Sequence, residues 1–147
     1  MNSEVLDSMI SLAMDSMRNA CVRDGDVPAG ACVMASDGTI YGGCSIEISI
    51  ARLSLPAEVV AMIKAITDGK REFDAVAVIA DLEHPYIPDG QSLQFLAEFG
   101  VPEVIMADMN GNVETVPLKD LLPYDQRRRE NKPSEAFLEA EEATFKF

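Results

Sequence analysis

Two acidic side chains, Glu58 and Asp89, stand where helices are predicted to begin, each within two residues of a proline. Carboxyl groups carry general acid–base chemistry when their surroundings separate their pKa values, so the two could donate and accept a proton. An acid in the first turn of a helix also stabilises the positive end of the helix dipole by about 0.3–1 kcal/mol. The residue types therefore leave both a catalytic and a purely structural role open for Glu58.

Other side chains have types that suit chemistry, but each has a commoner structural role. Asp81, Glu83 and His84 could join the two acids around a hard metal ion, although a lone histidine in a proline-flanked loop is more often solvated. Cys44 has no histidine close in sequence to activate it, which favours a buried thiol over a nucleophile. The run Arg127-Arg128-Arg129 could contact a phosphate, but before an acidic tail it more often forms solvated or intersubunit salt bridges.

The elements that must position these residues alternate along the chain. Apolar periodicity predicts helices over 3–21, 54–69, 89–99 and 118–122, and strands over 31–35, 39–46, 74–81, 103–107 and 113–116. Ser3 and Ser54 are the predicted N-caps of the first two helices, and Asp37-Gly38 and Asn110-Gly111 suit tight hairpin turns. This order predicts an α/β fold, a three-layer α/β/α sandwich with a mixed five-stranded sheet.

Composition limits the class of protein. The 147 residues suit one domain, which we place at 1–123, followed by a charged tail at 124–147. A net charge of −13 opposes binding to nucleic acid or to anionic membranes. The three cysteines are odd in number without Cys-x-x-Cys spacing, and the N-terminus is too polar for a secretory signal, so we expect reduced thiols and a cytoplasmic protein.

Three segments carry a resemblance to a known family. Gly43-Cys44-Ser45-Ile46-Glu47, Pro56-Ala57-Glu58 and Pro88-Asp89-Gly90-Gln91-Ser92 follow one another in an order that resembles the cytidine deaminase family, and the similarity runs over about residues 29–123. In that family, a His or Cys two residues before a Glu opens one helix, and Pro-Cys-x-x-Cys opens the next, so that the two helix starts hold a catalytic zinc. The resemblance implies the proton-shuttle position for Glu58 and substrate contacts for Ser45 and Glu47.

The same resemblance implies an assembly and a gap in the pocket. The family commonly forms homodimers or homotetramers, in which Phe145 or Phe147 could reach a neighbouring subunit. Val27 stands where the family has an aromatic residue near the pocket, so the sequence predicts that a stacking partner is missing.

The three zinc-ligand positions depart from the family pattern. They are occupied by Pro56, Asp89 and Ser92. Proline offers no donor and a serine hydroxyl is a poor one, whereas a catalytic zinc needs three good protein ligands and an open position for water. We therefore expect no zinc and no other metal cofactor.

Three functions remain open on these residues. The first is a protein that binds a pyrimidine nucleoside or similar small molecule without zinc-dependent deamination. The second is a nucleoside-processing enzyme, a deaminase or hydrolase, with an altered acid–base site formed by Glu58 and Asp89. The third is a structural or interaction protein whose cleft is filled by side chains such as Leu55, Pro56 and Tyr86.

Overall fold

A computed structural model describes residues 1–127 and 134–144, and a five-stranded sheet lies at its centre. The strands are β1 (Ala29–Ala35), β2 (Ile40–Cys44), β3 (Phe73–Ala80), β4 (Glu103–Ala107) and β5 (Val113–Pro117). Their order is β2-β1-β3-β4-β5, with β3 and β4 parallel and the other neighbours antiparallel. The predicted α/β fold with a mixed five-stranded sheet is confirmed.

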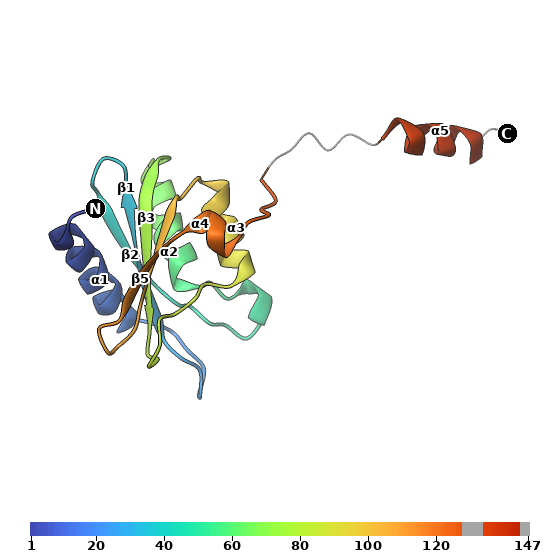
Figure 1. Cartoon of the computed structure of the whole chain (residues 1–147). Coiled ribbons are helices and arrows are strands. Elements are labelled where there is room, and N and C mark those ends of the chain that lie inside the picture. Colours follow the sequence, from blue (N-terminus) through green and yellow to red (C-terminus); the bar gives the residue numbers. More distant parts are fainter. Residues whose placement is uncertain (128–133, 145–147) are drawn as a thin grey trace.

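Helices cover both faces of this sheet (Figure 1). Helix α1 (Ser3–Met17) packs through Met9 and Ala13 on one face. Helices α2 (Ala57–Thr67) and α3 (Gly90–Glu98) pack on the other face, together with the short α4 (Leu118–Leu121). A 3-10 helix, η1 (Ala51–Leu53), precedes α2, and α5 (Glu135–Thr144) projects away from the sheet. None of the described helices is long and apolar enough to cross a bilayer.

Two glycines let helices rest directly on strands. A Cβ atom at Gly43 in β2 would lie 2.4 Å from the backbone nitrogen of Ala61 in α2. A Cβ atom at Gly30 in β1 would lie 1.9 Å from the carbonyl oxygen of Ala13 in α1. Only glycine permits such close approach of backbone to backbone. The contact at Gly43 sets the height of α2 above the sheet, and α2 carries Glu58.

The sequence predicts the hairpin turns correctly, but it predicts the first residues of the helices less well. Gly38 and Gly111 adopt φ values of 90° and 88°, as the predicted hairpin turns require. Helix α1 is capped by Asn2, whose side chain accepts from the backbone N–H of Val5 at 2.9 Å, and it ends at Met17, before the predicted residue 21. Ser54 does not cap α2, because its hydroxyl accepts from the backbone N–H of Ile48 at 3.0 Å.

Candidate functional site

A cleft of about 290 Å³ opens beside the start of α2 and the loop that leads into α3. Six of the residues that line it come from the three segments singled out above: Ser45, Glu47, Pro56, Ala57, Asp89 and Gln91. The fold thus brings together three segments that are far apart in sequence. Leu55 also lines the wall, and the cleft is open instead of filled by this side chain and its neighbours, which counts against the purely structural function.

Glu58 is buried next to this cleft without lining it. Its exposed fraction is 0%, and neither carboxyl oxygen has a hydrogen-bond partner among the described residues. Ser92, in the first turn of α3, is equally buried, and its hydroxyl has no hydrogen-bond partner in the same part of the chain. An unsatisfied buried polar group costs about 1–3 kcal/mol, so these side chains weaken the fold where they stand. Such groups concentrate where a ligand or reactant completes the site.

The surroundings of Glu58 favour its neutral form. Burial raises the pKa of this carboxyl, because removal from water penalises the charged state. The nearby Ser92 hydroxyl lowers the pKa by a smaller amount, although its geometry falls short of a hydrogen bond, and the Asp89 charge raises it. The net direction is upward, so Glu58 keeps its proton to a higher pH than an exposed glutamate.

Asp89 has a clear structural role. It is the N-cap of α3, and its Oδ1 accepts from the backbone N–H of Ser92 at 2.8 Å. Its side chain is exposed and lines the cleft. A capping aspartate contributes about 1 kcal/mol to helix stability. Capping occupies one oxygen, and the carboxylate can accept further bonds on the cleft side.

Ser45 and Glu47 also line the cleft, and both already accept hydrogen bonds from backbone N–H groups. The Ser45 hydroxyl accepts from the backbone N–H of Ala29 at 3.1 Å, which fixes the beginning of β1. Glu47 Oε2 accepts from the backbone N–H of Arg23 at 3.3 Å. The serine is buried and the glutamate half-buried, so the glutamate is the more available of the two for a ligand.

Tyr86 forms part of the cleft wall, whereas the sequence had offered it as one of the side chains that fill the cleft. It lies in the proline-flanked loop before α3, where no periodic pattern marks a side chain as inward-facing. Its ring packs against the core on the α2 side of the sheet, and it lines the cleft near Asp89. Burial raises the pKa of the Tyr86 phenol, and the nearby carboxyls of Glu58 and Asp89 raise it further. The hydroxyl therefore keeps its proton at neutral pH.

The remaining candidates do not join this site. His84 is exposed, and its Nδ1 lies 3.2 Å from the carbonyl oxygen of Pro85. Cys44 is a half-buried free thiol near the end of β2. Arg127 forms an ion pair with Asp125 at 2.9 Å, whereas Arg128, Arg129, Phe145 and Phe147 lie outside the described residues.

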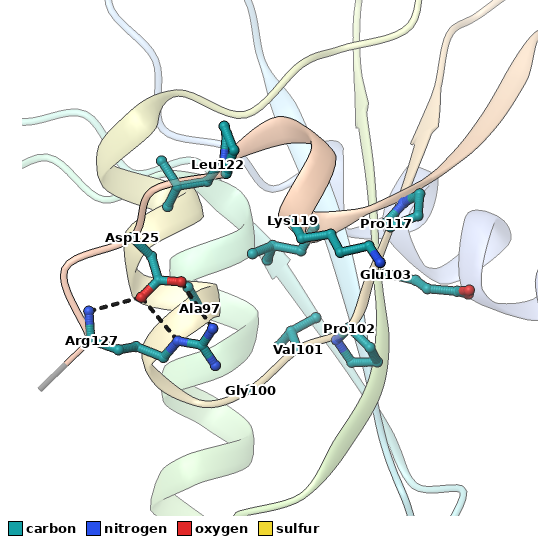
Figure 2. A pocket seen from close by; sticks show the side chains of 12 residues that line it. Ala97, Gly100, Val101, Pro102, Glu103, Pro117, Lys119, Leu122, Asp125 and Arg127 are labelled. Carbon is teal, nitrogen blue, oxygen red and sulfur yellow. Dashed lines mark hydrogen bonds and ion pairs between the residues drawn. The ribbon is translucent and has the colours of Figure 1, made fainter. Parts of the chain in front are cut away.

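A larger hollow of about 470 Å³ lies elsewhere, between α3, α4 and the beginning of β4. Figure 2 shows Lys119 at its edge and the ion pair of Asp125 with Arg127 beside it. Its floor is formed by backbone and by small or aliphatic side chains such as Ala97 and Val101. No unsatisfied buried polar atom of the described residues borders this hollow, so the smaller cleft is the better candidate for chemistry.

Pro56, Asp89 and Ser92 occupy the three positions at which the family holds zinc. Pro56 has no donor atom, Asp89 uses an oxygen to cap α3, and the Ser92 hydroxyl is a weak ligand. Within residues 1–127 and 134–144, no group of three or more His, Cys, Asp or Glu side chains could hold a metal ion. These three positions therefore depart from the family's usual ligand set, and the roles below are assigned to the chain's own groups.

Comparison with known proteins identifies relatives over most of the chain. No family model matches the sequence. A cytidine deaminase of Sporosarcina psychrophila is 38% identical over 120 residues, covering 80% of this chain and 88% of the relative. A cytidine deaminase of Halalkalibacterium halodurans is 30% identical over 117 residues, covering 78% and 89%. The crystal structure of a cytidine deaminase from Burkholderia pseudomallei superposes with a TM-score of 0.78 at 30% identity, covering 85% and 99%.

These relatives correct two predictions. A protein that binds a nucleoside without deaminating it is not supported, because the relatives at 38% and 30% identity are named as enzymes. The prediction that zinc is not a cofactor is contradicted as well, because cytidine deaminases are zinc-dependent enzymes. Both predictions gave too much weight to Pro56, Asp89 and Ser92 and too little to the rest of the domain.

Proposed function

Because the chain belongs to the cytidine deaminase family, we propose that it is an enzyme acting on a pyrimidine nucleoside or a similar small molecule. Glu58 carries the proton in this proposal. The observation that supports it most is a fully buried carboxyl without hydrogen-bond partners in the described chain, beside an open cleft. In an enzyme, a catalytic carboxyl group must be free to bind the reacting atoms, which explains why a destabilising buried group is kept.

The neutral form of Glu58 suits the edge of a cyclic amidine. A protonated carboxyl group offers one O–H donor and one carbonyl acceptor side by side. The edge of a cytosine-type ring offers the complementary pair, an acceptor ring nitrogen and an amino donor. The raised pKa of Glu58 keeps the donor available. Two parallel hydrogen bonds would then select amidine-bearing rings over rings that present the opposite pattern.

In hydrolytic deamination Glu58 would act both as a general base toward water and as a general acid toward nitrogen. The oxygen of water forms a bond to the ring carbon that carries the amino group, and the bond from that carbon to the amino nitrogen breaks. Glu58 transfers protons between the water and the ring and amino nitrogens, so that ammonia leaves and a carbonyl group remains. General acid–base transfer of this kind contributes about 10²–10⁴-fold to a rate.

Asp89, Ser45 and Glu47 complete the proposed site. Asp89 lies on the cleft, and its negative charge reinforces the neutral form of Glu58. Ser45 and Glu47 line the same cleft, where they are proposed to contact the sugar or its equivalent. The half-buried Glu47 carboxylate suits paired hydroxyl donors.

Self-association and location belong to the same proposal. A homodimer or homotetramer is supported by exposed apolar side chains on α5, Phe137 at 55% and Leu138 at 46%, and by Ile50 at 52% near the cleft. The division into a domain at 1–123 and a tail at 124–147 stays a prediction, and light scattering of the chain with and without this tail tests the tail's role in assembly. A cytoplasmic location is supported by three cysteines that are all free thiols.

The test of this function is an assay for the conversion of cytidine to uridine. The metal content of the same preparation is measured alongside it. We expect turnover by the unaltered protein and a loss of about 10²–10⁴-fold in Glu58→Gln, which keeps the shape but cannot exchange the proton. Glu4→Gln is the matched control, because Glu4 also lies in the first turn of a helix but is exposed. Equal turnover by Glu58→Gln and the unaltered protein would rule out Glu58 as the proton carrier.

A further inference from the structure

We propose that Tyr86 is a further substrate-contacting residue of this cleft, with its ring against the substrate's heterocycle and its hydroxyl donating a hydrogen bond to the polar edge beside Glu58. This inference rests on the proposed function, since it assigns a residue to the same site. It assigns the stacking surface to a segment other than that of Val27, the position at which the sequence predicts that a stacking partner is missing.

The loop that carries Tyr86 is fixed to the sheet by its backbone. The backbone N–H of Tyr86 donates to the carbonyl oxygen of Ala107, at the end of β4, at 3.3 Å. Farther back in the loop, the N–H of Asp81 donates to Pro28 at 3.1 Å, and the N–H of Met109 donates to Leu82 at 3.3 Å. The ring is held from behind by the core on the α2 side. A side chain placed in this way loses little further freedom when a ligand binds.

Tyr86 supplies the aromatic surface of the cleft on which a heterocyclic ring can stack. Among the described residues that line the cleft, it is the sole aromatic one. Val27 lines the same cleft, so the position that the family fills with an aromatic residue is present but aliphatic. A heterocyclic ring gains about 1–3 kcal/mol from stacking on an aromatic side chain in known complexes, and valine cannot supply the same contact.

Tyr86 lines the cleft together with Asp89 and with Ala57, the residue next to Glu58. The carboxyl groups of Glu58 and Asp89 both raise the pKa of the phenol, which agrees with this placement. The Ser45 hydroxyl is already bonded to the backbone of β1. A phenol O–H beside a neutral carboxyl gives two donors aimed at one region, an arrangement that stabilises developing negative charge on a substrate atom.

Tyrosine fluorescence gives a direct readout of this contact. The chain has three tyrosines and no tryptophan, so its emission comes from Tyr41, Tyr86 and Tyr124. Tyr41 donates to Asp68 on another part of the surface, and Tyr124 is 86% exposed. We expect cytidine to change the emission of the unaltered protein, and the signal to disappear in Tyr86→Phe and Tyr86→Leu.

Calorimetric titration with cytidine, with Glu58→Gln present in every variant so that the nucleoside is not converted, separates the contribution of the ring from that of the hydroxyl. Tyr86→Phe keeps the ring, so we expect the Kd to rise about 3- to 10-fold for one lost hydrogen bond. Tyr86→Leu removes both groups, and we expect a further rise of at least about 5-fold. Tyr124→Leu is the control and should bind cytidine like Glu58→Gln alone. Thermal unfolding of each variant shows that the domain is intact.

The possible results separate this inference from the proposed function. If the unaltered protein converts cytidine and both Tyr86 variants bind it with the original Kd, Tyr86 is not a contact residue and the proposed function stands. If Tyr86→Leu weakens binding but Tyr86→Phe does not, the assigned hydrogen bond is wrong. If the unaltered protein neither binds nor converts cytidine, both proposals fail.

Discussion

Glu58→Met is expected to make the protein more stable while removing its activity. The carboxyl group is fully buried, and both of its oxygens lack hydrogen-bond partners in the described structure. Methionine has a similar length and no polar oxygen, so the change removes the cost of an unsatisfied buried group, about 1–3 kcal/mol. A gain of about 2 kcal/mol would raise the midpoint of urea unfolding by about 1 M, given a typical slope near 2 kcal/mol/M.

The pH dependence of this gain follows from the raised pKa of Glu58. In the unfolded chain, a glutamate loses its proton near pH 4.3, whereas in the folded protein it keeps the proton to higher pH. Between these two pKa values the folded state binds more protons, so the unaltered protein loses stability as pH rises. Below the lower pKa both states are protonated, and this loss is absent. The advantage of Glu58→Met should therefore grow from about pH 4 upward.

Urea unfolding at pH 4.5 and pH 8, followed by circular dichroism, measures both effects. Glu4→Met is the control, because Glu4 lies exposed in the first turn of α1 and should lose about 0.3–1 kcal/mol of dipole interaction. A lower midpoint for Glu58→Met at both pH values would refute the reasoning, since it would mean that the carboxyl forms stabilising bonds in the folded protein.

Two further predictions concern packing and thiol chemistry. Gly43→Ala should destabilise the fold by about 1–3 kcal/mol, because the added Cβ would lie 2.4 Å from the backbone nitrogen of Ala61. The same change should displace α2 and so reduce turnover. Thermal unfolding measures the loss, with Gly90→Ala as the control, because a Cβ at Gly90 would meet nothing within 4 Å. Burial raises the pKa of Cys32 to about 12, so at pH 8 a thiol reagent should label the exposed Cys21 in the folded protein and reach Cys32 only after urea is added. Rapid labelling of Cys32 without urea would show that β1 opens readily.

The sequence predicted the elements better than it predicted the site. Asp89 was recognised at the start of a helix, because an N-cap is a local pattern, and the structure confirms it. Ser54 was assigned a cap by the same logic, but its hydroxyl bonds to Ile48 and Pro56 takes the N-cap position. The sequence predicts only a charged tail where helix α5 lies, because Phe137 and Leu138 are the only large apolar side chains among its ten residues.

The site depends on distances that a linear pattern does not contain. No local signal shows that both oxygens of Glu58 lack partners, since this results from how α2 and α3 pack together. Tyr86 lies in an irregular loop, and its place in the cleft wall goes with tertiary contacts, a backbone bond to the end of β4 and packing of its ring on the core. The prediction that deaminase activity is lost was wrong for a related reason. It rested on three substituted positions, whereas most of the domain still matches the sequence of a cytidine deaminase.

The close contact at Gly43 affects how freely the rest of the domain can vary. Where a helix rests on a strand through backbone atoms, its distance from the strand at that point is set by the backbone contact and not by a side chain. Substitutions among the methionines and aliphatic residues of the core can then accumulate with little displacement of the first turn of α2. Residues around the cleft can also change type while the carboxyl group of Glu58 keeps its place. A lineage with this architecture can exchange the partners of its central acid without rebuilding the scaffold that holds it.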